Sequence, residues 1–230
     1  MMSLSVSNVI LTRNFSSSGP LLVLIPGWAG LGAHLLATCP YLGPTVALAY
    51  TDSDTLTQLI VFLHEYDQFE LIIMAFSYGA FISLPAFDVF HSRIMRYYLV
   101  GICSHYSSRT LQFIRSKLQA NDQQYLKQFY QAAMTKNHFG KFSQYGFNDV
   151  ISFFSDVYLL QTLDHLGKLV INESVLTPYS ITFIHGQFDR IASLQSVQQL
   201  ADASKSQLYW ISDSGHFPFY SSLFWDVFDL

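Results

Sequence analysis

Short apolar runs constrain the fold of this chain more than any other feature. The runs are almost continuous in apolar residues, and most end at a turn signal such as Pro-Gly, Ser-Tyr-Gly or His-Gly. Strands buried on both faces of a parallel sheet have this composition, because neither face meets water. The sequence therefore predicts strands at Leu21–Ile25, Thr45–Tyr50, Leu71–Phe76, Tyr97–Cys103, Ile181–Ile184 and Leu208–Ile211.

Helical patterns separate these runs. The segment from Asp54 to about Tyr66 places leucines and isoleucine at helical spacing, and similar patterns cover about 78–90, 192–203 and 217–230. Strands that alternate with helices imply right-handed crossovers and a doubly wound, mostly parallel sheet, an α/β fold. In such sheets the ligand site lies at the carboxyl ends of the strands.

One long segment interrupts the alternation. Residues 104–170 contain no convincing strand and are rich in Gln, Phe and Tyr, so we interpret them as an inserted helical lid. We expect an α/β core formed by residues 1–103 and 171–230, with an edge element at Val6–Phe15. A chain of 230 residues fits this single-core arrangement.

Composition excludes several classes of protein. Charged residues make up 12% of the chain, against roughly 25% in an average soluble domain. The net charge of −4 argues against a nucleic-acid binder, and no uncharged apolar run reaches the length of a membrane span. Two cysteines give no disulfide framework, the N-terminus lacks the pattern of a signal peptide, and no phosphate-binding glycine loop or metal cluster is evident. We expect a cytoplasmic monomer with no cofactor, no metal and no membrane or nucleic-acid partner.

Three polar residues follow three predicted strands. Ser77 comes directly after Leu71–Phe76, Asp189 follows the run that ends at Ile184, and His216 follows the run that ends at Ile211. A nucleophile, an orienting carboxylate and a general base would meet at this edge of the sheet. Among the eight histidines, we expect His185 to be structural, and His105 could line the site.

Each of these residues also has a structural interpretation. Ser77 could be the N-cap of the following helix, since serine is a preferred capping residue. Asp189 could be a solvated loop residue that caps the helix beginning near Ala192. The order of the three residues along the chain favours catalysis, with Ser77, Asp189 and His216 as the catalytic set.

The segment Ala75-Phe76-Ser77-Tyr78-Gly79, with Asp189 and His216, resembles the nucleophile elbow and triad of the α/β-hydrolase family. Ala75 replaces the usual first glycine of that motif. The resemblance implies that His216 is the base and Asp189 orients it. It also implies an oxyanion hole formed by the backbone N–H groups of Trp28, in Pro26-Gly27-Trp28, and of Tyr78. Pro26 stands where the family often has His, and the Asp-x-x-Gly-x-Gly-x-Ser loop is missing. Trp28 could equally pack in the core.

Charge divides the chain unevenly. Within 104–170, seven cations against four anions give +3, whereas the remaining five cations against twelve anions give −7. A basic lid would attract an acidic partner, although a solvated helical face is the simpler interpretation. The seven cations are Arg109, Arg115, Lys117, Lys127, Lys136, Lys141 and Lys168.

Aromatic residues of the lid could pack on the sheet or line an apolar channel to Ser77. They are Phe129, Tyr130, Phe139, Phe142, Tyr145, Phe147, Phe153, Phe154 and Tyr158. Gly-Trp at the oxyanion strand, the basic lid and the compact size resemble the pimeloyl-acyl carrier protein methyl ester esterases of biotin synthesis. That resemblance implies a serine carboxylesterase whose acyl ester substrate is carried on acidic acyl carrier protein. The alternatives are an acyl thioesterase, a general short-chain carboxylesterase and a catalytically inactive binding protein of the same fold.

Overall fold

A seven-stranded sheet forms the centre of the molecule. The structure is a computed structural model that describes residues 9–15, 17–120, 123–144, 150, 152–176 and 179–228. The strand order is β1-β3-β2-β4-β5-β6-β7. All neighbouring pairs are parallel except β1 and β3, which are antiparallel. The strands are β1 (Ile10–Arg13), β2 (Leu21–Ile25), β3 (Thr45–Leu48), β4 (Leu71–Phe76), β5 (Ile94–Val100), β6 (Ile181–Gly186) and β7 (Gln207–Ile211).

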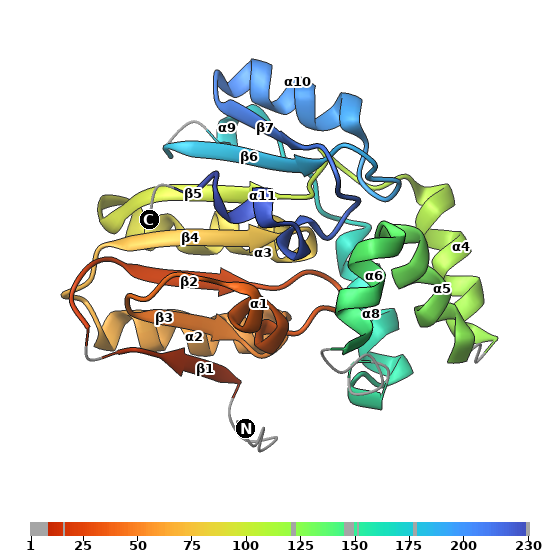
Figure 1. Cartoon of the computed structure of the whole chain (residues 1–230), viewed down its shortest axis with the longest axis horizontal. Helices are drawn as coiled ribbons and strands as arrows, with labels where there is room; N and C mark the ends of the chain where they lie inside the picture. The colour runs from red at the N-terminus through yellow and green to blue at the C-terminus, as the bar shows by residue number, and fades with distance from the viewer. Residues whose placement is uncertain are drawn as a thin grey trace.

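Helices cover both faces of this sheet, which confirms the predicted doubly wound α/β fold. Helices α1 and α11 lie in front of the strands in Figure 1, and α2 and α3 lie behind them. Every residue of β2 and β4 is buried, as expected for strands covered on two sides. The covering elements are α1 (Gly32–Thr38), α2 (Ser53–Glu65), α3 (Tyr78–Ala86), η1 (Phe87–Arg93), α9 (Glu173–Leu176), α10 (Leu194–Ser204), η2 (Pro218–Tyr220) and α11 (Ser222–Trp225).

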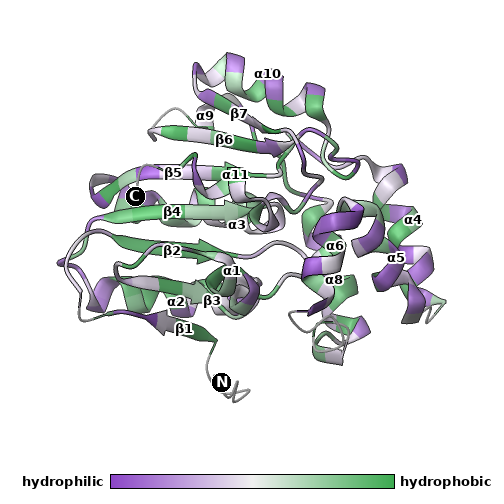
Figure 2. Cartoon of the chain, viewed as in Figure 1, coloured by the Kyte–Doolittle hydropathy of each residue, from purple (hydrophilic) through white to green (hydrophobic). Residues whose placement is uncertain are grey.

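A group of helices lies beyond the carboxyl ends of the parallel strands (Figure 1). It comprises α4 (Ser108–Gln119), α5 (Gln123–Ala133), α6 (Lys136–Gln144) and α8 (Asp156–Leu166), here called the helical insertion. The described residues between β5 and β6 include no strand. Figure 2 shows alternating hydrophobic and hydrophilic bands on α4, α5 and α6, whereas β2 and β4 are hydrophobic along most of their length. The insertion is therefore amphipathic and sits where the sheet presents its ligand edge.

Several predicted boundaries are wrong. The strand predicted at Thr45–Tyr50 ends at Leu48, and the helix predicted over 78–90 ends at Ala86, where η1 begins. The strand predicted at Tyr97–Cys103 is β5, Ile94–Val100, because Gly101 has a φ of +58° and turns the chain out of the sheet. The helix predicted over 217–230 is instead the short 3₁₀ turn η2 followed by the single-turn helix α11. Residues 229–230 lie outside the described part of the chain.

The N-terminal edge is one strand, β1, and the first part of the predicted edge element, residues 6–8, lies outside the described residues. Arg13 fixes the strand end, since its guanidinium donates hydrogen bonds to the carbonyls of Leu36, Cys39 and Tyr41. Helix α1, which the sequence analysis did not predict, begins at Gly32, and the preceding Leu31 provides no side-chain cap. Over the described ranges, no helix has the length and apolar character needed to cross a bilayer.

Candidate active site

Ser77 lies on a strained turn between β4 and α3. Its φ of +50° and ψ of −121° fall in a region that residues with a side chain rarely adopt. The turn has little room, because a Cβ at Gly79 would lie 2.4 Å from the carbonyl oxygen of Pro26. Glycine at this position therefore lets α3 start directly against the end of β2. Ser77 occupies the N-cap position of α3, as the alternative interpretation expects, but its side chain makes no capping hydrogen bond.

The structure brings Ser77, His216 and Asp189 together in one chain of hydrogen bonds. The distance from Ser77 Oγ to His216 Nε2 is 3.1 Å, and that from His216 Nδ1 to Asp189 Oδ2 is 2.8 Å. All three residues are buried. They come from the ends of β4, β6 and β7, so distant parts of the sequence meet at one edge of the sheet.

Asp189 faces His216 and accepts hydrogen bonds from the loop that follows it, but it does not cap a helix, since Ser193 is the N-cap of α10. Its Oδ1 accepts hydrogen bonds from the N–H groups of Ile191 at 2.8 Å and Ala192 at 3.0 Å, and Oδ2 faces His216. The side chain is buried, contrary to a solvated loop residue. Burial disfavours the charged carboxylate, but His216, His185 and the backbone N–H outweigh it and lower the pKa of Asp189.

His185 contacts the same carboxylate oxygen of Asp189 that faces His216. Its Nε2 is 3.2 Å from Asp189 Oδ2, and the side chain is completely buried. Burial lowers the pKa of His185, which favours the neutral ring. Its Nδ1 has no hydrogen-bond partner among the residues that the structure describes. The geometry thus places His185 next to the orienting residue and not next to Ser77.

The predicted oxyanion donors, Trp28 and Tyr78, flank Ser77. A Cβ on Gly27 would lie 3.0 Å from the Ser77 Cβ, so the Gly27-Trp28 turn closely approaches the nucleophile turn. Within the described part of the chain, neither the Trp28 nor the Tyr78 backbone N–H donates a hydrogen bond. Two free donors beside a serine are available to an anionic oxygen.

The side chains of Trp28 and Tyr78 attach the core to the insertion. Trp28 Nε1 donates to the Leu159 carbonyl at 3.1 Å, and its ring packs edge-on against Phe129. Tyr78 Oη lies 2.9 Å from His165 Nδ1. Helix α8, which carries Leu159 and His165, is therefore held directly over the nucleophile turn.

The insertion also holds the His216 loop. The His216 N–H donates to the Ala133 carbonyl, at the end of α5, over 2.7 Å. A Cβ at Gly215 would lie 2.5 Å from that same oxygen, so the loop and α5 pack backbone to backbone. The position of His216 thus depends on the insertion as well as on β7.

A cavity of about 350 Å³ opens at Ser77 and His216. Its lining is mostly apolar, which is typical of a pocket for an uncharged organic group. Trp28 and Phe217 come from the core, and most of the remaining wall comes from the insertion. That part comprises Thr110, Leu111, Phe113, Ile114, Tyr125, Gln128, Phe129, Ala132, Leu163 and Leu166.

The sequence analysis found only part of this wall. Of the lid aromatics it named, Phe129 lines the cavity, whereas Phe113 and Tyr125 line it and were missed. Tyr145 and Phe147 lie outside the described residues.

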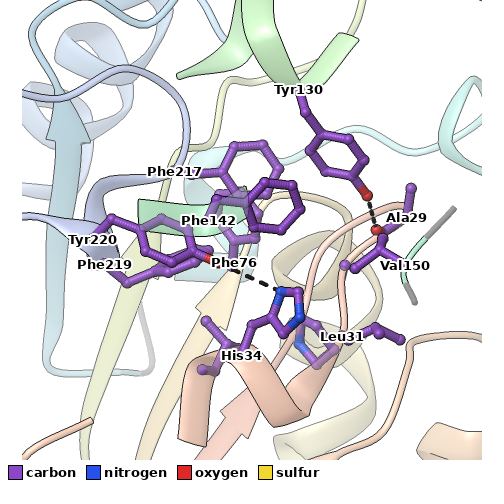
Figure 3. Close-up of a pocket in the computed structure, with 13 residues that line it drawn as sticks. Ala29, Leu31, His34, Phe76, Tyr130, Phe142, Val150, Phe217, Phe219 and Tyr220 are labelled. Atoms are coloured by element: carbon purple, nitrogen blue, oxygen red, sulfur yellow. Dashed lines mark hydrogen bonds between the residues drawn. The ribbon is translucent and has the colours of Figure 1, made fainter. Parts of the chain in front are cut away.

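Tyr130 and Phe142 surround a second, much smaller void of about 10 Å³ on the other side of Phe217 (Figure 3). Phe76, Phe219 and Tyr220 complete its aromatic lining. Figure 3 shows the Tyr130 hydroxyl bonded to the Ala29 carbonyl and Tyr220 bonded to His34. This cluster is packed tightly enough to brace the segment after His216.

Sequence reasoning also missed Tyr106. The Tyr106 hydroxyl lies 3.1 Å from Ser77 Oγ, and its ring is buried in the cavity wall. His105, named as a possible lining residue, is exposed and borders a separate polar cleft. Both residues lie in the loop after β5, and the sequence does not show that Tyr106 rather than His105 faces Ser77.

No group of three or more potential metal-ligating side chains occurs among the described residues. Cys39 and Cys103 are free and buried.

Neither a protein-family profile nor a curated protein sequence matches the chain. Solved structures do match. An esterase from Exiguobacterium antarcticum is 16% identical with a TM-score of 0.78, covering 91% of this chain and 89% of that one. A bromoperoxidase from Bacillus anthracis is 15% identical with a TM-score of 0.72, covering 90% and 88%. MGS-M2, an α/β-hydrolase enzyme from a Medee basin deep-sea metagenome library, is 12% identical with a TM-score of 0.69, covering 93% and 90%. At such identities the likeness establishes architecture, and the chain has the α/β-hydrolase fold.

Proposed function

We propose that this protein is a serine carboxylesterase that hydrolyses an ester of an apolar acyl group. One observation carries the proposal: the hydrogen-bonded chain Ser77–His216–Asp189 ends at a largely apolar cavity of about 350 Å³. A nucleophile, its base and an orienting carboxylate within hydrogen-bond reach are the parts that acyl transfer requires.

In the proposed reaction, His216 Nε2 takes the proton of Ser77 as Oγ attacks the ester carbonyl. The Trp28 and Tyr78 N–H groups hold the resulting oxyanion, and the His216 proton passes to the departing alcohol. Asp189 keeps Nδ1 protonated and stabilises the imidazolium that forms between the two transfers. Water then repeats the sequence on the acyl-enzyme and releases the acid.

A series of p-nitrophenyl esters from acetate to decanoate tests this proposal. We expect turnover of the wild type, with kcat/KM rising as the acyl chain fills the cavity, and no enzymatic turnover by Ser77→Ala. A wild type that is no faster than Ser77→Ala at every chain length would favour the binding-protein alternative.

A narrower substrate follows from the insertion. We propose an acyl chain carried on an acidic carrier protein, with the methyl ester of pimeloyl-acyl carrier protein as the first candidate. Of the seven cations in the insertion segment, three are already engaged: Arg115 pairs with Asp164, Lys141 donates to the Tyr220 carbonyl, and Lys117 lies over the Phe113 ring. The other four are exposed and make no ion pair or hydrogen bond with described residues; they are Arg109, Lys127, Lys136 and Lys168.

The leaving group distinguishes the two enzymatic alternatives. Methanol released from a methyl-ester acyl carrier substrate supports the esterase, whereas release of the carrier thiol supports the thioesterase. Replacing Lys127, Lys136 and Lys168 with Gln should weaken hydrolysis of the carrier-linked ester several-fold at low salt and leave a small free ester unaffected. Lys205→Gln, which removes an exposed cation of the core, is the matched control. Equal effects on the two substrates would refute carrier docking at these lysines.

A further inference from the structure

The nucleophile has a second hydroxyl partner that the proposed mechanism does not use. Tyr106 Oη lies 3.1 Å from Ser77 Oγ, the same distance that separates Oγ from His216 Nε2. The Tyr106 ring is buried and packs on Phe81 with ring centroids 5.7 Å apart. The packing fixes the ring, so the hydroxyl is aimed at Oγ rather than sampling the cavity.

Counting protons gives the direction of this hydrogen bond. The Asp189 carboxylate can only accept, so His216 Nδ1 carries the hydrogen and Nε2 is the bare nitrogen. The single Ser77 proton is then donated to Nε2, and Oγ is left with lone pairs alone. With Ser77 donating to Nε2, as the proposed mechanism requires, Tyr106 is the donor to Oγ. Burial raises the pKa of Tyr106 above its ordinary value, which keeps the phenol protonated throughout the working pH range.

A donor at Oγ acts differently on the two halves of the reaction. In the free enzyme Oγ is a hydroxyl oxygen, which is a good hydrogen-bond acceptor. The hydrogen bond from Tyr106 therefore already stabilises the ground state from which acylation starts. In the acyl-enzyme Oγ is the bridging oxygen of an ester, which is a weak acceptor. Negative charge returns to Oγ only as the acyl–Oγ bond breaks, and an interaction stronger in the transition state than in the ground state accelerates that step.

We propose that Tyr106 is a catalytic residue of deacylation that donates a hydrogen bond to Ser77 Oγ as it leaves; this rests on the proposed function. Water adds to the acyl carbon while His216 Nε2 takes one water proton. The acyl–Oγ bond then breaks, and the proton on Nε2 moves to Oγ. Tyr106 keeps its own proton, so the products are the carboxylic acid and the original Ser77 hydroxyl.

Rapid mixing of Tyr106→Phe with p-nitrophenyl butyrate tests this role, because the burst reports acylation and the steady state reports deacylation. We expect the deacylation constant to fall about 10-fold or more, as for loss of a hydrogen bond to a charged group, while the acylation constant changes less than about 3-fold. Acylated Ser77 should accumulate, and intact-protein mass spectrometry measures it. Tyr98→Phe is the matched control, since Tyr98 is a buried tyrosine of β5 that does not line the cavity, and its hydroxyl has no hydrogen-bond partner among the described residues.

Two results with Tyr106→Phe would overturn the inference. One is a deacylation constant equal to that of the wild type. The other is an equal loss in the acylation and deacylation constants while the thermal unfolding midpoint is unchanged. If the unfolding midpoint of Tyr106→Phe drops markedly, Tyr106→Trp provides a second comparison, because tryptophan keeps an aromatic N–H donor. Deacylation by Tyr106→Trp that is no faster than by Tyr106→Phe would also contradict the inference. A failure of the proposed function looks different, because Ser77→Ala would then show the same burst as the wild type.

Discussion

The two walls of the cavity are built on different principles. The core wall carries Ser77, His216 and Trp28, whose positions follow from strand ends, a strained turn and close backbone contacts. The insertion wall carries apolar side chains on amphipathic helices, such as Phe113 and Leu163. The core wall should tolerate few substitutions, because its backbone contacts are close. The insertion wall depends on the packing of apolar side chains, so its shape can vary with their size. Under the proposed function, the core wall supplies the chemistry and the insertion wall supplies the selectivity.

The largest effect should come from Ser77→Ala on the core wall. We expect loss of ester turnover by about 10⁵-fold or more, because the nucleophile of a triad acts as a unit with its base. The unfolding midpoint should stay close to that of the wild type, since the hydroxyl does not cap α3. Steady-state kinetics with p-nitrophenyl butyrate measures the loss, and residual activity above about 1% would show that the chemistry lies elsewhere.

Asp189→Asn should have the next largest effect, about 10³–10⁴-fold on kcat, because an amide can donate to Nδ1 and stabilise the wrong tautomer of His216. The amide oxygen can still accept the Ile191 and Ala192 N–H groups, so the loop should stay folded. The measurement is kcat with the same ester, with circular dichroism as the check on folding. A loss of less than about 10-fold would mean that Asp189 only caps the backbone.

On the insertion wall, Phe113→Ala should change selectivity and not chemistry. Phe113 lines the cavity with 58% of its surface exposed, so its removal should cost little stability. We expect kcat/KM for an octanoyl ester to fall about 3- to 10-fold, the range for losing a few apolar contacts, with the acetyl ester unchanged.

Phe153→Ala is the matched control for that experiment. Phe153 is exposed and packs against Tyr50 and Phe154, away from the cavity lining. Equal losses for octanoyl and acetyl esters in Phe113→Ala would contradict the division of labour between the walls.

The smallest effect should be on the pH dependence of the free energy of unfolding. It involves two buried histidines, His185 in the core and His138 in α6. Burial lowers the pKa of both, so the unfolded chain binds more protons than the folded one just below pH 6.5. The free energy of unfolding should therefore decrease as pH falls through this range. Replacing either histidine with Gln should flatten that decrease, which urea unfolding at pH 7.5 and 5.5 would measure. An unchanged difference between the two pH values would show that neither histidine is the source.

The core wall could be predicted from sequence, because strand ends are visible as apolar runs that stop at turn signals. Ser77, Asp189 and His216 each follow the carboxyl end of such a strand, and parallel pairing brings these strand ends to one edge of the sheet. Tyr106 escaped because the sequence does not show which side chain of the loop after β5 faces Ser77; the neighbouring His105 was named instead, and it is exposed. The second role of Asp189 as an acceptor of backbone N–H was also visible, but only the fold shows that one carboxylate performs both.

The insertion wall could not be predicted in the same way. Helical periodicity shows which face of α4 or α5 avoids water, but it does not show whether that face meets another side chain or a cavity. Phe142 and Phe129 illustrate the difference: both are buried aromatics of the insertion, yet one closes a void of about 10 Å³ and the other lines the large cavity. Helix α1 was missed for a related reason, since it lacks the capping residue that marks a helix start.

The most direct test of the central claim is covalent labelling with an alkyl fluorophosphonate, which reacts with an activated serine. The account predicts one phosphonyl group per wild-type chain, located by peptide mass spectrometry on the peptide that contains Ser77, and a much slower reaction in His216→Ala. No adduct on the folded wild type, or an adduct on another residue, would contradict it.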